Sequence, residues 1–250
     1  MNSLGFVFSH FIGRFSADSL GERVSRSVCV MQSARPEVSR RVLDTDAPCI
    51  VKMKEIAAMR SDSISLAQGV VHWGPPPNAI SEAMRGMEDP LVHGYGPAEG
   101  SPLLREALQQ KLLEENGLRD VAVMVTAGAN QAFVNVVLTL CDPSDRVVLF
   151  RPYYFNHLMA LQMTGSGRSV IFGECNAQTL HPDLDWLEQI LSSSERPKMV
   201  VLVNPCNPTG VALSREEVIR ASQLCQEAGA WLVLDNTYEV RYRGPGVEAD

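Results

Sequence analysis

The chain has 250 residues, of which 45% are hydrophobic and 20% charged, with a formal net charge of -7. It is too apolar for a disordered chain and long enough for one large core, so we expect a globular protein. The basic residues form no stripe and no apolar run approaches the roughly 20 residues of a membrane span, which argues against nucleic-acid binding and membrane insertion. Small ligands are the expected partners. The six cysteines form no CxxC pair, so we expect neither a metal site nor a disulfide framework.

Residues 1–38 differ from the rest of the chain and form a predicted N-terminal extension. They contain four arginines, many serines and no lysine, which is typical of a mitochondrial or plastid targeting peptide. Asp18, Glu22 and Glu37 argue against targeting, because such peptides are usually poor in acids. A disordered extension or a mis-assigned start therefore stays open, and without targeting we expect a cytoplasmic protein.

From residue 99 onward, short apolar runs alternate with helical segments, as in a parallel sheet covered by helices. The runs are nearly continuous, as expected for strands buried on both faces. The five predicted strands are 121–126 (VAVMVT), 146–150 (RVVLF), 169–174 (SVIFGE), 199–204 (MVVLVN) and 230–235 (AWLVLD).

Two of the intervening helices have recognisable ends. One is predicted to begin after Ser101, with proline at its first position, and to stop at Gly117. The other should begin with a capping box formed by Ser214 and Glu217 and end at Gly229. In such a sheet, ligands gather at the carboxyl ends of the strands, where loops lead into helices.

The first two strand ends carry features of a ligand site. After 121–126 comes AGANQAF, whose small residues would let the backbone N–H groups of Gly128, Ala129 and Asn130 approach an anion at a helix start. An ordinary tight turn is the alternative. After 146–150 comes RPYYFNH, whose aromatic side chains could stack on a planar ligand or simply pack.

The last two strand ends add polar groups. In VLVNPCNPTG (201–210), each proline restricts the asparagine before it, so that the Asn204 and Asn207 amides point in defined directions. A doubled turn without function is the alternative. Asp235 ends the last strand, and a carboxylate there needs a cation or strong donors unless it is solvated. Tyr238 follows three residues later.

Together these strand ends suit a ligand with a phosphate, a flat ring, an oxygen that needs a donor and a protonated ring nitrogen. Pyridoxal 5′-phosphate has all four groups. The GxGxxG fingerprint of dinucleotide sites and the GxxxxGK[ST] fingerprint of nucleotide loops are absent from the sequence.

The stretches HGYGPAEGSPLLREAL, VTAGANQAF, PYYFNH, NPCNPTG and VLDNTY resemble the successive motifs of fold-type I aminotransferases of class I/II. SLAQGVVHWGPP is similar in particular to plant-type aromatic aminotransferases. The resemblance runs from about residue 40 to the end. It implies an α/β fold of the aspartate aminotransferase type, with 39–98 as the small-domain segment and linker and 99–250 as a truncated αβα large domain. It also implies amino acid and 2-oxo acid substrates and a homodimer.

The resemblance assigns the ring end of a pyridoxal 5′-phosphate site to four side chains. Asp235 would keep the ring nitrogen protonated, and the ring would then accept electrons from the substrate. Asn207 and Tyr238 would hydrogen-bond the ring's 3′-oxygen. Tyr154 would stack over the ring.

The same resemblance assigns the phosphate end and the substrate contact. Ala127, Gly128 and Ala129 match the phosphate loop. Tyr95 matches the tyrosine that reaches the phosphate of the neighbouring subunit, and Gly69 matches the glycine beside the substrate carboxylate.

The resemblance identifies no catalytic residue in the chain, because the family's Schiff-base lysine stands in a Ser-x-x-Lys context expected after residue 250. None of the four lysines matches it: Lys52 and Lys54 lie in the N-terminal segment, Lys111 is predicted to face solvent, and Lys198 precedes a strand at the opposite end. We therefore expect no appreciable transaminase turnover from these 250 residues alone.

The family's strand order also predicts a gap in the sheet. That order is 3-2-4-5-6-7-1, and this chain supplies strands one to five. The strand 121–126 would then lack a neighbour, at about 1–3 kcal/mol for each unpaired buried backbone group.

Two further hypotheses stay open. One is a relative with the same cofactor contacts that performs 1-aminocyclopropane-1-carboxylate synthesis or C–S lysis. The other is a non-catalytic remnant that pairs with a full-length paralogue and donates Tyr95 to it.

Overall fold

The computed structural model describes residues 37–60, 62, 64, 69 and 72–239, so the predictions for residues 1–36 lie outside the described residues. Its first elements are helical. They are α2 (Arg40–Leu43), α3 (Cys49–Ala58), α4 (Pro77–Met87), the 3-10 helix η1 (Pro90–His93) and α5 (Pro102–Asn116). No side chain of these five helices is fully buried by the described part of the chain.

Four of the five predicted strands form one parallel sheet. They are β1 (Val147–Arg151), β2 (Val170–Glu174), β3 (Met199–Val203) and β4 (Trp231–Asp235), in the order β2-β1-β3-β4. Every pairing is parallel, with Val147 opposite both Val170 and Met199. This order is the 3-2-4-5 part of the order expected from the resemblance, so that prediction is confirmed.

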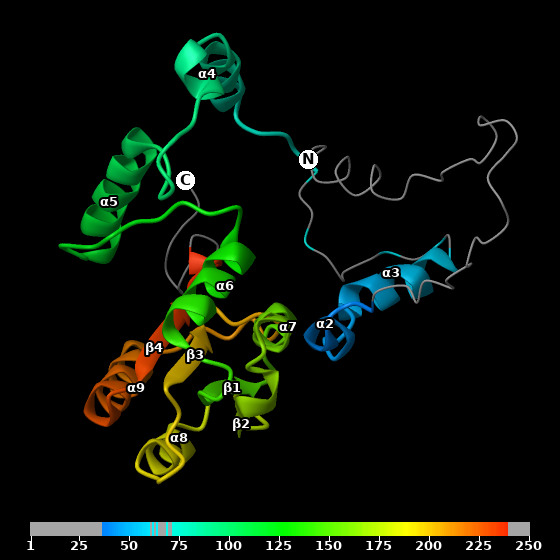
Figure 1. Cartoon of the computed structure of the whole chain (residues 1–250), viewed down its shortest axis with the longest axis vertical. Coiled ribbons are helices and arrows are strands. Elements are labelled where there is room, and N and C mark those ends of the chain that lie inside the picture. The colour runs from blue at the N-terminus through cyan, green and yellow to red at the C-terminus, as the bar shows by residue number, and fades with distance from the viewer. Residues whose placement is uncertain (1–36, 61, 63, 65–68, 70–71, 240–250) are drawn as a thin grey trace, which may run out of the picture. The chain divides into compact units, whose positions relative to one another are not determined.

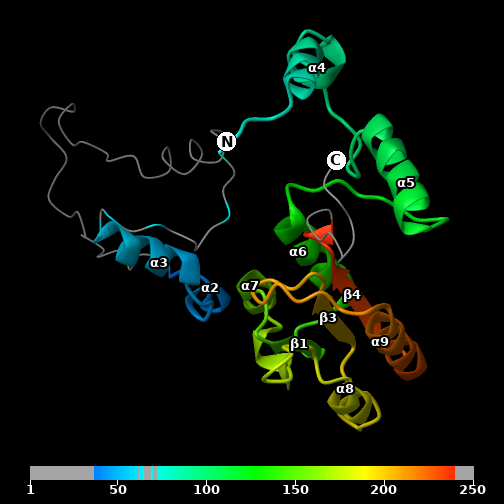
Figure 2. The ribbon, with the colours of Figure 1, turned by 180° about the vertical axis from the view of Figure 1, so that it is seen from behind.

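Helices cover the sheet on both faces (Figure 1). Alternate residues of β1 and β3 point to opposite sides, because successive side chains of a strand leave opposite faces. Leu149 and Val201 pack with α6 (Ala129–Leu140) and α7 (Phe155–Thr164). Val148 and Val200 pack with α8 (Leu184–Leu191) and α9 (Arg215–Ala228). The two layers are visible from behind in Figure 2, and the αβα sandwich is confirmed.

The predicted strand 121–126 is wrong, because this segment has no regular secondary structure and pairs with no strand among the described residues. Side chains and backbone groups outside the sheet satisfy part of its backbone instead. Arg105 Nε donates to the Val123 carbonyl at 2.9 Å, and the Val125 N–H donates to the Glu99 carbonyl at 2.9 Å. The missing neighbour was expected from the family's strand order.

The predicted helix ends agree with the structure. The helix expected after Ser101 is α5, and it ends at Gly117, which has a left-handed φ of 68°. The Ser101 side chain makes no capping hydrogen bond, so only its position was predicted correctly. The capping box of Ser214 and Glu217 is present at the start of α9, and Gly229 ends that helix.

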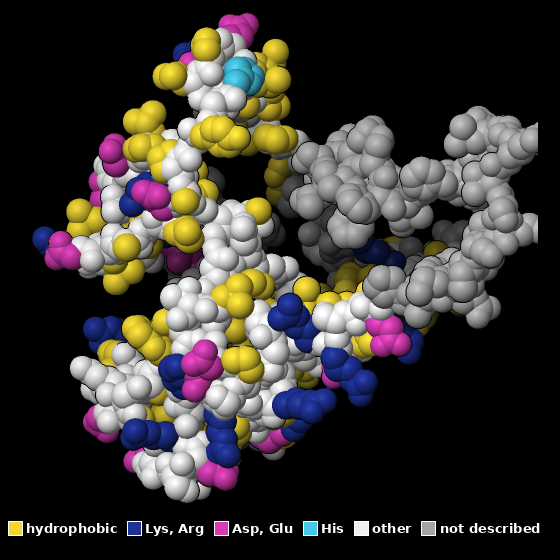
Figure 3. All heavy atoms as spheres, viewed as in Figure 1, with side chains coloured by type: hydrophobic (Ala, Val, Ile, Leu, Met, Phe, Trp, Pro, Cys, Tyr) yellow, Lys and Arg dark blue, Asp and Glu magenta, His cyan; other side chains and the backbone are white. Residues whose placement is uncertain are grey.

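Apolar side chains are exposed on the helices before the sheet. Figure 3 shows hydrophobic side chains on the surfaces of α4 and α5, and Met84, Met87 and Leu103 are each more than 60% exposed. No helix among the described residues is both long and apolar enough to cross a membrane.

Replacing Gly173 with alanine should destabilise the sheet. A Cβ at this position of β2 would lie 2.5 Å from Trp186 and 2.7 Å from Phe150, whose rings meet edge to face. We expect a loss of about 1–3 kcal/mol in the free energy of unfolding, measured in urea, because the two rings must move. Gly86→Ala is the control, since nothing lies within 4 Å of its added Cβ in α4. An equal effect of both substitutions would contradict the expectation.

Candidate active site

A cleft of about 180 Å³ lies where the predicted ligand site was expected, at the carboxyl ends of β3 and β4 beside the start of α6. Seven of the nine residues assigned from the resemblance line it. The complete lining is Ala127, Gly128, Ala129, Asn130, Tyr154, Val203, Asn207, Asp235, Thr237 and Tyr238. Loops that are separate in the sequence therefore converge on one site.

Asp235 has the partner that its position requires. His157, in the first turn of α7, places Nε2 3.0 Å from Asp235 Oδ2, and the two side chains are only 3% and 13% exposed. The Thr237 hydroxyl and N–H both donate to Asp235 Oδ1, at 2.6 and 3.0 Å. Both carboxylate oxygens are thus hydrogen-bonded, while the carboxyl group still lines the cleft.

The electrostatics of Asp235 favour the charged form. Burial alone would raise its pKa, but the hydrogen bonds from His157 and Thr237 outweigh burial and lower the pKa to about 2. The cleft therefore holds a carboxylate that stays ionised at neutral pH. Such a group suits a protonated nitrogen or another cation in the cleft.

The two asparagines of NPCNPTG have different roles. Asn207 Nδ2 donates to the Tyr238 hydroxyl at 3.2 Å, and both side chains line the cleft. Asn204 Oδ1 instead accepts the Leu213 N–H at 2.8 Å, so its amide closes the loop before α9. Of the two amides held in defined directions, that of Asn204 therefore serves the loop, while Asn207 and Tyr238 offer polar groups to an oxygen in the cleft.

Aromatic side chains hold the wall of the cleft near His157. The Tyr154 hydroxyl accepts a hydrogen bond from Asn156 Nδ2 at 2.8 Å. The His157 ring lies between Tyr154, which it meets edge to face at 5.3 Å, and Phe133 of α6, at 4.2 Å. These contacts fix the imidazole that bonds Asp235, and they leave Tyr154 in the cleft lining.

The start of α6 provides backbone donors. The Ala129 and Asn130 N–H groups have no hydrogen-bond partner among the described residues, and both residues line the cleft. The Ala127 N–H donates to Gln131 Oε1 at 2.6 Å. The expectation that the Gly128 N–H faces an anion is wrong, because this N–H donates to the Thr126 carbonyl at 2.8 Å. An anion in the cleft would thus meet the helix through Ala129 and Asn130.

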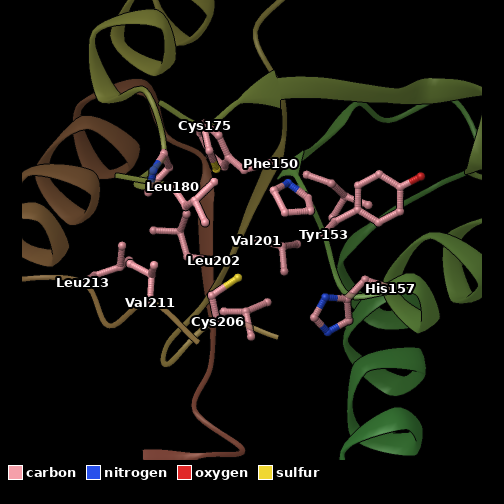
Figure 4. A pocket seen from close by; sticks show the side chains of 14 residues that line it. Phe150, Tyr153, His157, Cys175, Leu180, Val201, Leu202, Cys206, Val211 and Leu213 are labelled. Atoms are coloured by element: carbon pink, nitrogen blue, oxygen red, sulfur yellow. The ribbon is translucent and has the colours of Figure 1, made fainter. Parts of the chain in front are cut away.

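A second cavity of about 40 Å³ lies behind His157 and is almost entirely apolar. Figure 4 shows His157 and Tyr153 on one side of this cavity and Leu180, Val211 and Leu213 on the other. His157 Nδ1 is buried and finds no hydrogen-bond partner in the described part of the chain. Apolar surroundings keep the local dielectric low, which strengthens the bond from Nε2 to Asp235.

Two residues assigned from the resemblance do not reach the cleft. Tyr95 follows η1 with its side chain fully exposed, and Gly69 is exposed with nothing within 4 Å of an added Cβ. Neither lines the cleft. Their roles toward a neighbouring subunit and toward a substrate stay predictions.

No lysine lines the cleft, and all four lysines of the chain are among the described residues. Lys198 precedes β3, as expected, and pairs with Asp145 at 2.7 Å. Lys111 is not simply solvent-facing, contrary to the prediction. It is 29% exposed and pairs with Glu115 and with Glu239, which follows β4.

Sequence reasoning missed His157 as a member of the site. It lies in the PYYFNH stretch, of which only the aromatic residues were interpreted as possible ligand contacts. The sequence offered one signal: Asp235 needs a hydrogen-bond donor, and a histidine follows another strand of the same sheet, β1. Thr237, two residues after Asp235, was missed in the same way.

The fold is an α/β sandwich with a cleft at the carboxyl edge of its parallel sheet, which is where such folds bind small ligands. The family model described as aminotransferase class I and II matches residues 61–249. The aromatic aminotransferase ISS1 of Arabidopsis thaliana is 52% identical over 203 residues, covering 81% of this chain and 51% of that protein. The aspartate aminotransferase of Streptomyces avermitilis is 28% identical, covering 84% of this chain and 53% of that protein.

Solved structures agree with these relatives. An aminotransferase from Mycobacterium tuberculosis superposes with a TM-score of 0.73 at 24% identity, covering 86% of this chain and 56% of that one, and shows the fold. Aspartate aminotransferase from Thermus thermophilus with maleate gives 0.67 at 28% identity, covering 80% and 53%. The chain belongs to the class I and II aminotransferase family. It spans about half the length of these relatives.

The depressed pKa of Asp235 predicts a loss of stability in acid. Because the folded-state pKa is about 2 and the ordinary value is 3.8, the stabilisation is complete above about pH 4 and is lost as the pH falls toward 2. The difference in unfolding free energy between the protein and Asp235→Asn should shrink by up to about 2 kcal/mol over that range.

Carboxyl NMR titration of the protein and of His157→Phe gives the complementary measurement. Removing the histidine donor should raise the pKa of Asp235 above its value in the unsubstituted chain, with the Thr237 bonds still present. An unchanged pKa in His157→Phe would show that the imidazole does not hold the carboxylate ionised.

Proposed function

We propose that this chain forms the cofactor-binding part of a pyridoxal 5′-phosphate-dependent aminotransferase that acts on aromatic amino acids or methionine and their 2-oxo acids. The observation that carries the proposal is the ionised Asp235 carboxylate, held by His157 and Thr237 in a cleft that also contains free helix N–H groups. The 52% identity to an aromatic aminotransferase supports the substrate class.

The donor set fits this cofactor. An ionised carboxylate suits a protonated pyridine nitrogen, and the Asn207 and Tyr238 polar groups suit the ring's 3′-oxygen. The Ala129 and Asn130 N–H groups suit the phosphate, since the start of a helix attracts anions. Tyr154 lines the cleft between these two ends, where its ring can stack on a flat ligand.

Bound in this cleft, pyridoxal 5′-phosphate would supply an electron sink for the carbanion formed at the substrate α-carbon. The chain's own residues would keep the ring nitrogen protonated, so that the ring accepts electrons well. Asp235 would hold a proton on the ring nitrogen by charge pairing, and His157 would keep Asp235 ionised and oriented. The Asn207 amide would keep its hydrogen bond to the Tyr238 hydroxyl and donate its second N–H to the 3′-oxygen.

A homodimer belongs to the same proposal. The fully exposed Tyr95 side chain is available to a second copy. Exposed apolar side chains on α4, including Met84 and Met87, would be covered in such an assembly. Gly69 would lie beside the substrate carboxylate.

Binding of pyridoxamine 5′-phosphate tests the proposal, because this amine form needs no lysine to bind. We expect its fluorescence to change on addition of the chain, and Asp235→Asn to weaken binding about tenfold or more, since a neutral amide loses the charge pair. Asp185→Asn, on the exposed face of α8, is the control and should bind normally. Equal affinities for all three proteins would rule out Asp235 as the partner of the ring.

The position of the lysines predicts binding without turnover for these 250 residues. After incubation with pyridoxal 5′-phosphate and borohydride, mass spectrometry should find no lysine modified stoichiometrically, because none lines the cleft. Tryptophan and a 2-oxo acid should give no transamination above the free cofactor. The control is a relative that spans the whole family fold. Turnover comparable to that control would contradict the expectation.

A further inference from the structure

We propose that Gln131 is a positioning residue that sets the affinity of the cleft for the phosphate group, by holding the turn 127–129 in place. The inference rests on the proposed function, because it concerns the phosphate end of the same cleft. Gln131 itself does not line the cleft and would act through the turn.

The geometry resembles a capping box displaced by one residue. Gln131 is the third residue of α6, and its Oε1 reaches back to accept the Ala127 N–H at 2.6 Å. In a capping box, the side chain at this helix position accepts the N–H of the residue just before the helix, which here is Gly128. Gln131 instead ties down the residue before the N-cap. The Thr126 hydroxyl adds a second tie, since it donates to the Gly128 carbonyl at 3.0 Å.

The turn needs these ties because Gly128 is conformationally permissive. Its φ of 89° is a conformation that costs glycine little, and glycine can equally adopt many others. The Ala129 and Asn130 donors follow immediately, so a rotation at Gly128 would redirect them away from the cleft. With the Ala127 N–H fixed on the helix by Gln131, the turn stays in one conformation, and less entropy is lost when an anion binds.

The effect should be confined to one end of the cleft. Asp235, Asn207 and Tyr238, which would face the ring, are held by His157, Thr237 and each other, and no hydrogen bond links them to Gln131 in the described part of the chain. Removing the Gln131 acceptor should therefore weaken ligands that carry the phosphate and spare those that lack it.

The first measurement needs no ligand. Amide hydrogen exchange of Ala127, followed by NMR, should be at least about fivefold faster in Gln131→Met than in the unsubstituted chain, because methionine has a similar length but no comparable acceptor. Gln131→Glu keeps an acceptor oxygen and should restore the slow exchange. Gln110→Met is the matched control, since the Gln110 side chain donates to Glu114 on the exposed side of α5.

The second measurement compares pyridoxamine 5′-phosphate with pyridoxamine, which lacks the phosphate. Gln131→Met should raise the Kd of the phosphorylated ligand about five- to tenfold and leave the Kd of pyridoxamine unchanged within about twofold. A general structural defect would weaken both ligands equally, and that result would overturn the inference.

The outcomes separate the two proposals. If the unsubstituted chain binds no pyridoxamine 5′-phosphate, the proposed function fails. If Ala127 exchange is the same in Gln131→Met as in the unsubstituted chain, the positioning role of Gln131 fails, whether or not the chain binds the ligand. Faster exchange of Ala127 together with a selective loss of phosphate affinity supports both.

Discussion

The hydrogen bond between His157 and Asp235 joins the first turn of α7 to the end of β4. A carboxylate at this depth would be destabilising without donors, because burial opposes its charge. The hydrogen bonds from His157 and Thr237 outweigh burial and favour the charged form, and the result is a fixed negative charge facing a cleft. The imidazole is fixed in turn by Phe133 and Tyr154, so three segments of the chain meet around one charge: α6, the start of α7 and the end of β4.

The cleft combines two kinds of recognition that arise from different parts of the fold. The end near β4 uses side chains whose hydrogen bonds are made before any ligand arrives: Asp235, Asn207 and Tyr238. The end near α6 uses backbone N–H groups, which exist at every helix start but face a ligand only if the preceding turn is held. Gln131 and Thr126 hold that turn. The charge near β4 and the position of the N–H groups near α6 thus depend on different residues. Substitutions at one end should therefore leave the other end unchanged.

Much of the fold was predictable from the sequence, because buried parallel strands and helix caps are local patterns. The capping box of Ser214 and Glu217 and the helix end at Gly117 were both predicted correctly from residue type and spacing. The apolar pattern of 121–126 predicted a strand wrongly, because this pattern equals that of the paired strands while pairing depends on segments far away in the sequence; only the resemblance predicted the missing neighbour. Without a partner strand, this apolar run has no regular secondary structure.

The candidate site was predictable where a residue's own position limits it, as for Asp235 at a strand end. It was not predictable where two segments had to meet. Sequence alone could not show that Asn204 turns to Leu213 while Asn207 turns to Tyr238, since both asparagines precede proline in the same loop. His157 was missed because its role exists only once α7 is packed beside β4.

The protonation of the ligand ring nitrogen tests the central claim most directly. Pyridoxamine 5′-phosphate labelled with ¹⁵N in its ring, bound to the chain at neutral to mildly alkaline pH, should give the chemical shift of a protonated pyridine nitrogen. In Asp235→Asn the bound ligand should give the shift of the unprotonated nitrogen. An unprotonated nitrogen in the unsubstituted chain would contradict the assignment of Asp235 as its partner.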